Sequence, residues 1–115
     1  MIRLELAAAV LAVMTTAANA QTTVDRWIAL CSNQASEADQ HACRAYARGV
    51  ADSVILMRKS NPQQVNICIP DGISEKDLVD LTLPYVQGQT PTSPPLPAAN
   101  QLVSALAGAF PCVKR

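Results

Sequence analysis

The residues of this 115-residue chain best suited to chemistry are its four cysteines, Cys31, Cys43, Cys68 and Cys112. Structural zinc ligands usually come in close pairs such as C-x-x-C, and no two cysteines here are that close, so we expect no metal site. A catalytic cysteine needs a base, and no histidine stands in a recognisable pattern with any of them. An even number of cysteines in a small exported chain is instead typical of a disulfide framework.

The other reactive residues form no catalytic pattern. His41 is the only histidine and falls at the polar start of a predicted helix. Asp71, Asp77 and Asp80 could form a carboxylate site, but Asp77 suits a helix cap and Asp80 a solvent-facing helix position. The sequence has neither a glycine-rich phosphate loop nor a G-x-S-x-G motif. We therefore predict a protein that is not an enzyme and that has neither catalytic residues nor a cofactor.

Residues 1–20 have the pattern of a signal peptide. Arg3 gives a weak positive start, Leu6 to Met14 is a short apolar run, and Ala18-Asn19-Ala20 is an A-x-A cleavage signal. The alternative is an amphipathic first helix of a cytosolic domain, which the unbroken apolar run disfavours. The run is shorter than the ~20 residues that span a bilayer, and no later stretch is longer. We predict export and cleavage after Ala20, with no membrane span.

Composition describes a small neutral domain that needs help to be stable. The chain has nine basic and nine acidic residues, and loss of Arg3 and Glu5 leaves eight of each. Without a basic stripe, nothing predicts nucleic-acid binding. Aromatic residues make up only 3% of the chain. A core of Val, Leu, Ile and Ala on a chain this short is marginal, which favours disulfides.

Helical periodicity predicts two helices in the first half of residues 21–115. A capping-box pattern at Thr22 and Asp25 opens a helix that should reach about Ala35. A second begins at Ser36 and runs to about Lys59, before Pro62. Its apolar face is predicted to hold Cys43, Ala47, Val50, Val54 and Met57, with Tyr46 and Ser53 alongside. Gly49 within it should let another backbone approach closely.

The second half predicts two further helices. Residues 63–70 form an extended connection held by Cys68, and Pro70-Asp71-Gly72 is a turn. A capping box at Ser74 starts a third helix, with Leu78, Leu81, Thr82 and Tyr85 on its apolar face. Pro84 should kink it or end it near Leu83, and Gly88 marks its end. After the proline-rich loop 89–97, a fourth helix is expected from Pro97 to Phe110.

Short connections place sequential helices antiparallel, which brings particular cysteines together. Four cysteines allow three pairings, and spacing alone does not choose between them. Cys31 and Cys43 fall at helix ends that should meet, as do Cys68 and Cys112. We therefore favour Cys31–Cys43 and Cys68–Cys112 in an all-α, disulfide-bonded bundle of about four helices.

Several motifs together resemble the Rap/Tai immunity-protein family. They are Cys31, C-R-A-Y-A-R-G-V-A-D at 43–52, C-I-P-D-G-I-S at 68–74 and A-F-P-C at 109–112. The resemblance covers nearly all of residues 21–115 and implies a small helical periplasmic protein. It also implies that the chain binds a secreted peptidoglycan amidase of a type VI secretion system, occludes the active site of that enzyme, and can form a homodimer.

Two other roles stay open at the level of sequence. A small periplasmic acid-stress chaperone would shed order at low pH through carboxylates such as Asp25, Asp52 and Asp80. An envelope protein of unrelated role is the other alternative. For a binding role, the exposed candidates are the Ser60–Gln64 turn and the loop 89–97.

Overall fold

The fold is organised around one long helix, α3, which spans Glu37–Ser60. The computed structural model describes residues 21–89 and 96–113. Ser36 caps α3, because its side chain accepts a hydrogen bond from the Asp39 backbone N–H at 3.1 Å. Acidic residues occupy the first turn and basic residues the last, an arrangement that complements the helix dipole. The predicted start and end of this helix are confirmed to within one residue.

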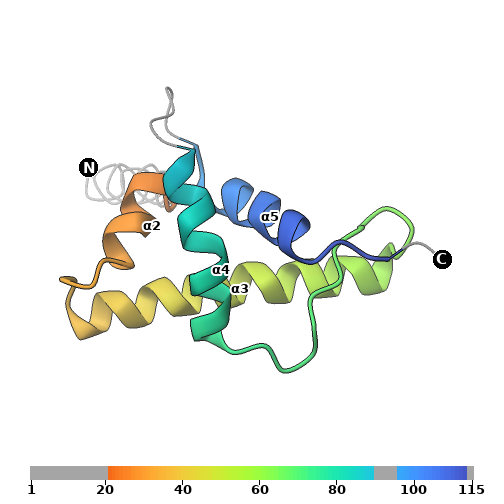
Figure 1. Ribbon diagram of the computed structural model, residues 1–115, viewed down its shortest axis with the longest axis horizontal. Coiled ribbons are helices and arrows are strands. Elements are labelled where there is room, and N and C mark those ends of the chain that lie inside the picture. Colours follow the sequence, from red (N-terminus) through yellow and green to blue (C-terminus); the bar gives the residue numbers. More distant parts are fainter. Residues whose placement is uncertain (1–20, 90–95, 114–115) are drawn as a thin grey trace, which may run out of the picture.

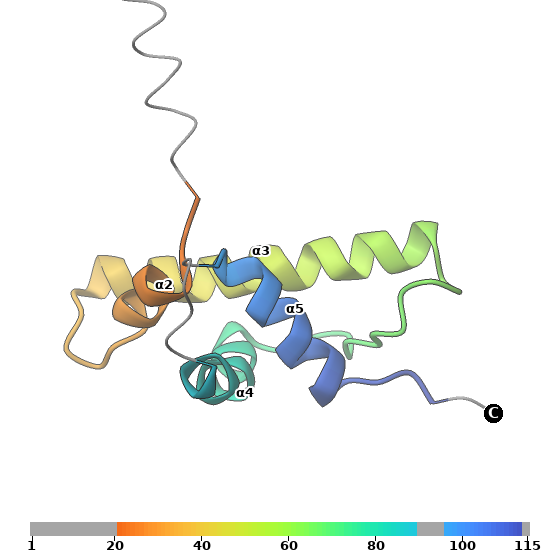
Figure 2. The same cartoon turned by 90° about the horizontal axis from the view of Figure 1, so that it is seen from above.

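Three shorter helices complete the bundle: α2 at Val24–Leu30, α4 at Glu75–Gly88 and α5 at Ala98–Ala109. All three lie along the same side of α3, with α4 crossing it steeply (Figures 1 and 2). The described segments contain no strand, only two isolated β-bridges. The prediction of an all-α bundle of about four helices is confirmed.

A core of small and branched side chains lies between α3 and the other helices. Trp27 is its largest member and is fully buried. From α3 the core takes Cys43, Ala47, Ala51 and Val54. The helices α4 and α5 contribute Leu78, Thr82, Val86, Ala98, Leu102, Ala105 and Leu106. The alanines on α3 allow the shorter helices to pack close to its backbone.

The first helix differs from its prediction at both ends. Thr23, not Thr22, is the cap, accepting a hydrogen bond from the Arg26 N–H at 3.3 Å. The helix ends at Leu30 and not near Ala35. Beyond it, the Gln34 N–H donates to the Ser32 hydroxyl at 3.2 Å, a local bond that competes with helix formation. The chain therefore reverses direction before α3 begins.

Pro84 does not end α4 near Leu83. The helix continues to Gly88, the residue that was predicted to mark its end. The Pro84 ring lies on the exposed side of the helix, and so does Asp80, whose carbonyl loses its usual partner. A carbonyl on a solvent-facing side can bond to water instead, so the interruption costs little. Ser74 caps this helix as predicted, accepting from the Asp77 N–H at 3.0 Å.

The connection between α3 and α4 is extended, as predicted, and it has a partner that the sequence did not reveal. Ile67 forms an antiparallel bridge with Pro111, and the Cys68 N–H donates to the Phe110 carbonyl at 2.7 Å. Gly72 makes the turn before α4 with a positive φ of 76°. No helix among the described residues is long and apolar enough to cross a membrane.

Candidate protein-binding surfaces

The residues that could have formed a catalytic site are dispersed. His41 is exposed near the start of α3, and no hydrogen bond or ion pair joins it to a carboxylate within the described residues. Asp71 is exposed in the turn before α4. Asp80 pairs with Lys76 through a hydrogen bond of 2.7 Å, which raises the pKa of Lys76. Both partners are exposed, so this pair contributes little to stability.

Metal binding receives no structural support either. Within residues 21–89 and 96–113, no three His, Cys, Asp or Glu side chains lie close enough to hold an ion. All four cysteines are joined in disulfides. The chemistry of the cysteines is therefore structural crosslinking.

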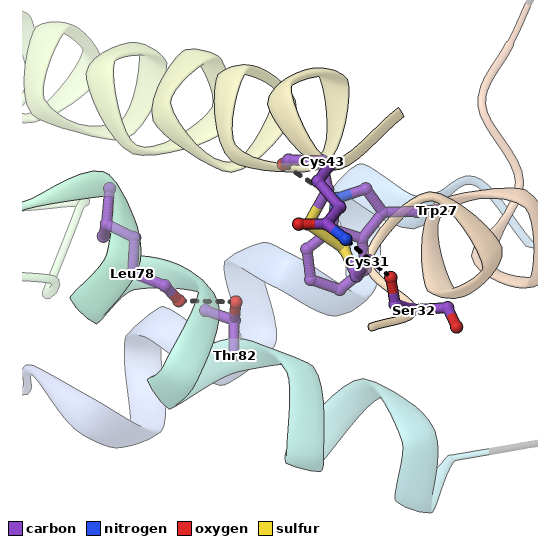
Figure 3. The surroundings of a disulfide bond; sticks show 7 residues. Trp27, Cys31, Ser32, Cys43, Leu78 and Thr82 are labelled. Atoms are coloured by element: carbon purple, nitrogen blue, oxygen red, sulfur yellow. Dashed lines mark hydrogen bonds between the residues drawn. A yellow bond between two sulfur atoms is a disulfide. The ribbon is translucent and has the colours of Figure 1, made fainter. Parts of the chain in front are cut away.

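Both favoured pairings, Cys31–Cys43 and Cys68–Cys112, are confirmed. Cys31–Cys43 ties the end of α2 to the first turns of α3, beside the indole of Trp27 (Figure 3). The Trp27 Nε1–H donates to the Cys43 carbonyl at 3.2 Å inside the core. The corner between α2 and α3 is therefore held by the Cys31–Cys43 disulfide, the buried Trp27 ring and its buried hydrogen bond.

The second disulfide, Cys68–Cys112, closes a loop of the chain that contains both α4 and α5. It spans 44 residues and joins the connection before α4 to the segment after α5. The end of α3 is fixed to the same connection, because Arg58 Nη1 donates to the Val65 carbonyl at 2.8 Å. Arg48, near the middle of α3, also donates to the Ile73 carbonyl. These contacts fix the connection that leads into α4, so the start of α4 is held to α3 and to the segment after α5.

One exposed apolar surface lies on α4, and we call Leu81 and Tyr85 the α4 ridge. These side chains are 45% and 40% exposed. They were predicted to lie on the core face together with Leu78 and Thr82. That prediction is confirmed for Leu78 and Thr82, which are buried with Val86, and is wrong for Leu81 and Tyr85. Residues four apart share a face, so Leu81 and Tyr85 stand together on the outer side. Exposed tyrosine in such a setting is typical of binding surfaces.

A signal for this ridge was present in the sequence. The helix α4 carries more apolar residues than one inward face can hold. They are Leu78, Val79, Leu81, Leu83, Tyr85 and Val86. A helix that is apolar on more than one side is either wholly buried or has a second face for a partner. Within residues 21–89 and 96–113 no element covers Leu81 and Tyr85, so this side of α4 is a candidate surface for a partner.

A second uncharged surface, the α3 groove, runs between α3 and α5 and has a volume of about 550 Å³. Its lining residues are Ala45, Tyr46, Gly49, Val50, Ser53, Val54, Met57, Ala99 and Val103. Gly49 was expected to receive another backbone, but a Cβ built there would have nothing within 4 Å. Met57, predicted as core, is 47% exposed. The space above Gly49 is therefore left open by the chain's own packing.

The two connectors chosen from sequence are only partly described. The Ser60–Gln64 turn is exposed, and Arg58 Nη1 also contacts the Pro62 carbonyl at 3.4 Å. Residues 90–95 of the proline-rich loop lie outside the described residues. The loop's far end is anchored, because the Ala98 N–H donates to the Thr22 carbonyl at 2.9 Å.

Comparison with known families gives one match. The model of the Rap1a immunity proteins matches residues 23–112. This chain belongs to the Rap1a immunity protein family. The matched segment begins at the Thr23 cap of α2 and ends at Cys112, so this Rap1a-family domain includes all four helices and both disulfides. No curated protein and no solved structure matches the chain.

Proposed function

We propose that this Rap1a-family protein is a periplasmic immunity protein against a peptidoglycan amidase effector of a type VI secretion system. The observation that carries the proposal is the family match over residues 23–112. Two disulfides in so small a domain suit an oxidising compartment outside the cytoplasm. The leader pattern with cleavage after Ala20 supplies the route there.

Inhibition by occlusion requires a preformed surface, and the α4 ridge meets that requirement. Rigid surfaces lose less conformational entropy on binding, and α4 is fixed through Ser74, the neighbouring connection and the core. Tyr85 offers a large apolar ring with a hydroxyl that can bond to the partner. In our proposal Leu81 and Tyr85 pack against the rim of the amidase cleft, so that the bundle closes it without any catalytic step.

The test compares Tyr85→Ala with Val113→Ala. Val113 lies after α5, is 87% exposed and belongs to neither proposed surface, so it serves as the apolar control. Loss of a central tyrosine should weaken effector binding by about 2 kcal/mol, or roughly thirtyfold. The measurements are the Kd for amidase effectors encoded beside this gene and the protection of peptidoglycan from digestion.

Each outcome of that test has a separate meaning. If none of the neighbouring amidases binds or is inhibited, the proposed function is wrong. If one binds and Tyr85→Ala has no more effect than Val113→Ala, the function stands and the α4 ridge is the wrong surface.

The α3 groove is our proposed contact for a homodimer. Exposed uncharged residues are spaced evenly about Gly49: Ala42 and Ala45 lie seven and four positions before it, Ser53 and Leu56 four and seven after. In an antiparallel contact across a two-fold axis at Gly49, the small Ala42 would face the large Leu56 of a second copy. A two-fold contact needs such self-complementarity. The surface lies on the side of α3 away from α4, so it leaves the α4 ridge free.

Gly49→Leu should convert such a dimer to a monomer at micromolar concentrations, because the side chain would occupy the space at the axis. Gly108→Leu on α5 is the control, since a Cβ there also meets nothing within 4 Å. Light scattering coupled to gel filtration measures the mass. A wild-type protein that is monomeric at high concentration, or a Gly49→Leu variant that stays dimeric, would contradict this contact.

The acid-stress alternative is not favoured by the placement of its carboxylates. Asp25 is exposed in the first turn of α2. The Asp52 and Asp80 side chains are 62% and 58% exposed in their ion pairs with Arg48 and Lys76. Exposed pairs contribute less than about 1 kcal/mol each, so acid removes little stability.

We therefore expect the helical circular dichroism signal to change little between pH 7 and pH 3. Disulfides and an apolar core do not titrate in this range, so the fold should persist. Loss of most helicity at pH 3, together with suppression of aggregation of an acid-unfolded client protein, would favour the chaperone role instead.

A further inference from the structure

The proposed cleavage after Ala20 would make Gln21 the first residue of the mature protein. Gln21 is exposed and precedes α2, which begins at Val24. The residues that follow it are held to the start of α5. The Ala98 N–H donates to the Thr22 carbonyl at 2.9 Å, and the Val24 N–H donates to the Leu96 carbonyl at 3.1 Å. Gln21 therefore lies directly before a segment, Thr22 to Val24, that backbone hydrogen bonds hold against the start of α5.

We propose that Gln21 cyclises to pyroglutamate once the leader is removed. The neutral α-amine attacks Cδ of the same residue, forming an N–Cδ bond, while the Cδ–Nε2 bond breaks and Nε2 leaves as ammonia. The proton lost by the amine goes to the departing nitrogen. No oxidant, reductant or second substrate is needed. Because α-amino groups titrate near pH ~7.7–8.0, a fraction of neutral amine is present at neutral pH.

The structure leaves Gln21 free to react. No hydrogen bond to another described residue holds its side chain. Since Gln21 lies outside the helix and outside the bridge between Thr23 and Pro97, its side chain can fold back on the amine without breaking a described contact.

A cyclised Gln21 would protect the segment that anchors α2 and α5. Exopeptidases that start from a free amine would next remove Thr22 and Thr23. Their loss would delete the cap of α2, where Thr23 Oγ1 accepts from the Arg26 N–H at 3.3 Å. It would also delete the Thr22 carbonyl that holds Ala98. The lactam has no primary amine, so it blocks the first of these steps.

The experiment is intact-mass analysis and N-terminal sequencing of protein recovered from the periplasm of a Gram-negative host. The control is Gln21→Ser, whose side chain cannot form the lactam. We expect the wild-type mass to lie below that of residues 21–115, with two disulfides formed, by one ammonia, with no readable N-terminus. The Gln21→Ser protein should show its full mass, and sequencing should read serine as its first residue.

This inference rests on the export step of the proposed function and not on the effector. A mature wild-type chain that keeps an unmodified Gln21 after days at neutral pH overturns cyclisation while leaving export and immunity intact. A chain that retains its leader, or that begins at another residue, overturns both the cleavage prediction and the cyclisation. Failure to bind an amidase leaves the mass measurement unaffected, so the two proposals are distinguished.

Discussion

Replacing Trp27 with alanine is expected to lower the free energy of unfolding by about 3–5 kcal/mol. The indole is fully buried, packs against the Cys31–Cys43 disulfide and donates a hydrogen bond to the Cys43 carbonyl. Alanine removes most of that volume and leaves a cavity that α2 and α3, joined by a covalent bond, cannot close fully. Domains of this size are stable by about 5–15 kcal/mol in total, so the variant should lose a substantial share of its stability and unfold at a clearly lower urea concentration.

Trp27→Phe separates packing from hydrogen bonding at this site. Phenylalanine fills much of the cavity but cannot donate, so we expect a loss of only about 1–2 kcal/mol. The measurement is urea unfolding followed by circular dichroism, because Trp27 is the only tryptophan and its fluorescence disappears with it. A loss below about 1 kcal/mol for Trp27→Ala would show that the corner is held by the disulfide alone.

The paired substitution Cys68→Ala with Cys112→Ala should cost about 4 kcal/mol. In the chain-entropy model, a crosslink over 44 residues restricts the unfolded chain by that amount. The remaining contacts at this end are the Ile67–Pro111 bridge, the Cys68 N–H to Phe110 bond and the packing of the half-buried Ile67 and Phe110 against the core. Substituting both partners avoids leaving an unpaired thiol that could form wrong crosslinks.

The matched pair is Cys31→Ala with Cys43→Ala, for which the same model gives about 3 kcal/mol over 12 residues. Because Cys43 is buried, loss of its sulfur adds to that cost. Together the two disulfides account for a large part of the expected stability, so full reduction should unfold the domain. Urea unfolding with and without reductant measures both effects. A reduced protein that keeps its unfolding midpoint would contradict the crosslinked-bundle description.

If the α4 ridge inhibits the amidase, the two disulfides also serve function. The connection before α4 is fixed by Cys68, and α2, which contacts α4, is fixed by Cys31. We expect the Cys68/Cys112 variant to bind effector more weakly at temperatures where it remains folded, because the ridge would then lose conformational freedom on binding. Such a loss would separate rigidity from contact chemistry, since Leu81 and Tyr85 are unchanged.

The location of the helices followed closely from local signals in the sequence. Ser36 and Ser74 mark the starts of α3 and α4, because each hydroxyl accepts a hydrogen bond from a first-turn backbone N–H that has no partner within the helix. The cysteine pairing also followed, because Cys31 and Cys43 sit at helix ends that a short turn must bring together. The prediction that Pro84 could end α4 near Leu83 was wrong. Whether a proline ends a helix depends on whether the carbonyl it leaves unpaired faces solvent, and that is not visible in the sequence.

The candidate surfaces could not be placed in the same way. Periodicity placed Leu81 and Tyr85 on one apolar face with Leu78 and Thr82, but it did not show that the core receives Leu78 and Thr82 and leaves Leu81 and Tyr85 exposed. That choice depends on how α4 is rotated against α3 and α5, whose contacting residues lie far from it in sequence. The same holds for Gly49, whose missing side chain creates space that nothing in this chain fills.

By itself, the sequence determined an all-α bundle and most of its helix boundaries to within a few residues, and it favoured the two crosslinks that the structure contains. These depend on backbone hydrogen bonding and chain connectivity, which are local. Only the tertiary structure decided which apolar residues stay exposed, because burial is a property of neighbouring elements. Among the described residues α3 and α4 each keep an uncovered side, and these are the two surfaces that we propose for binding.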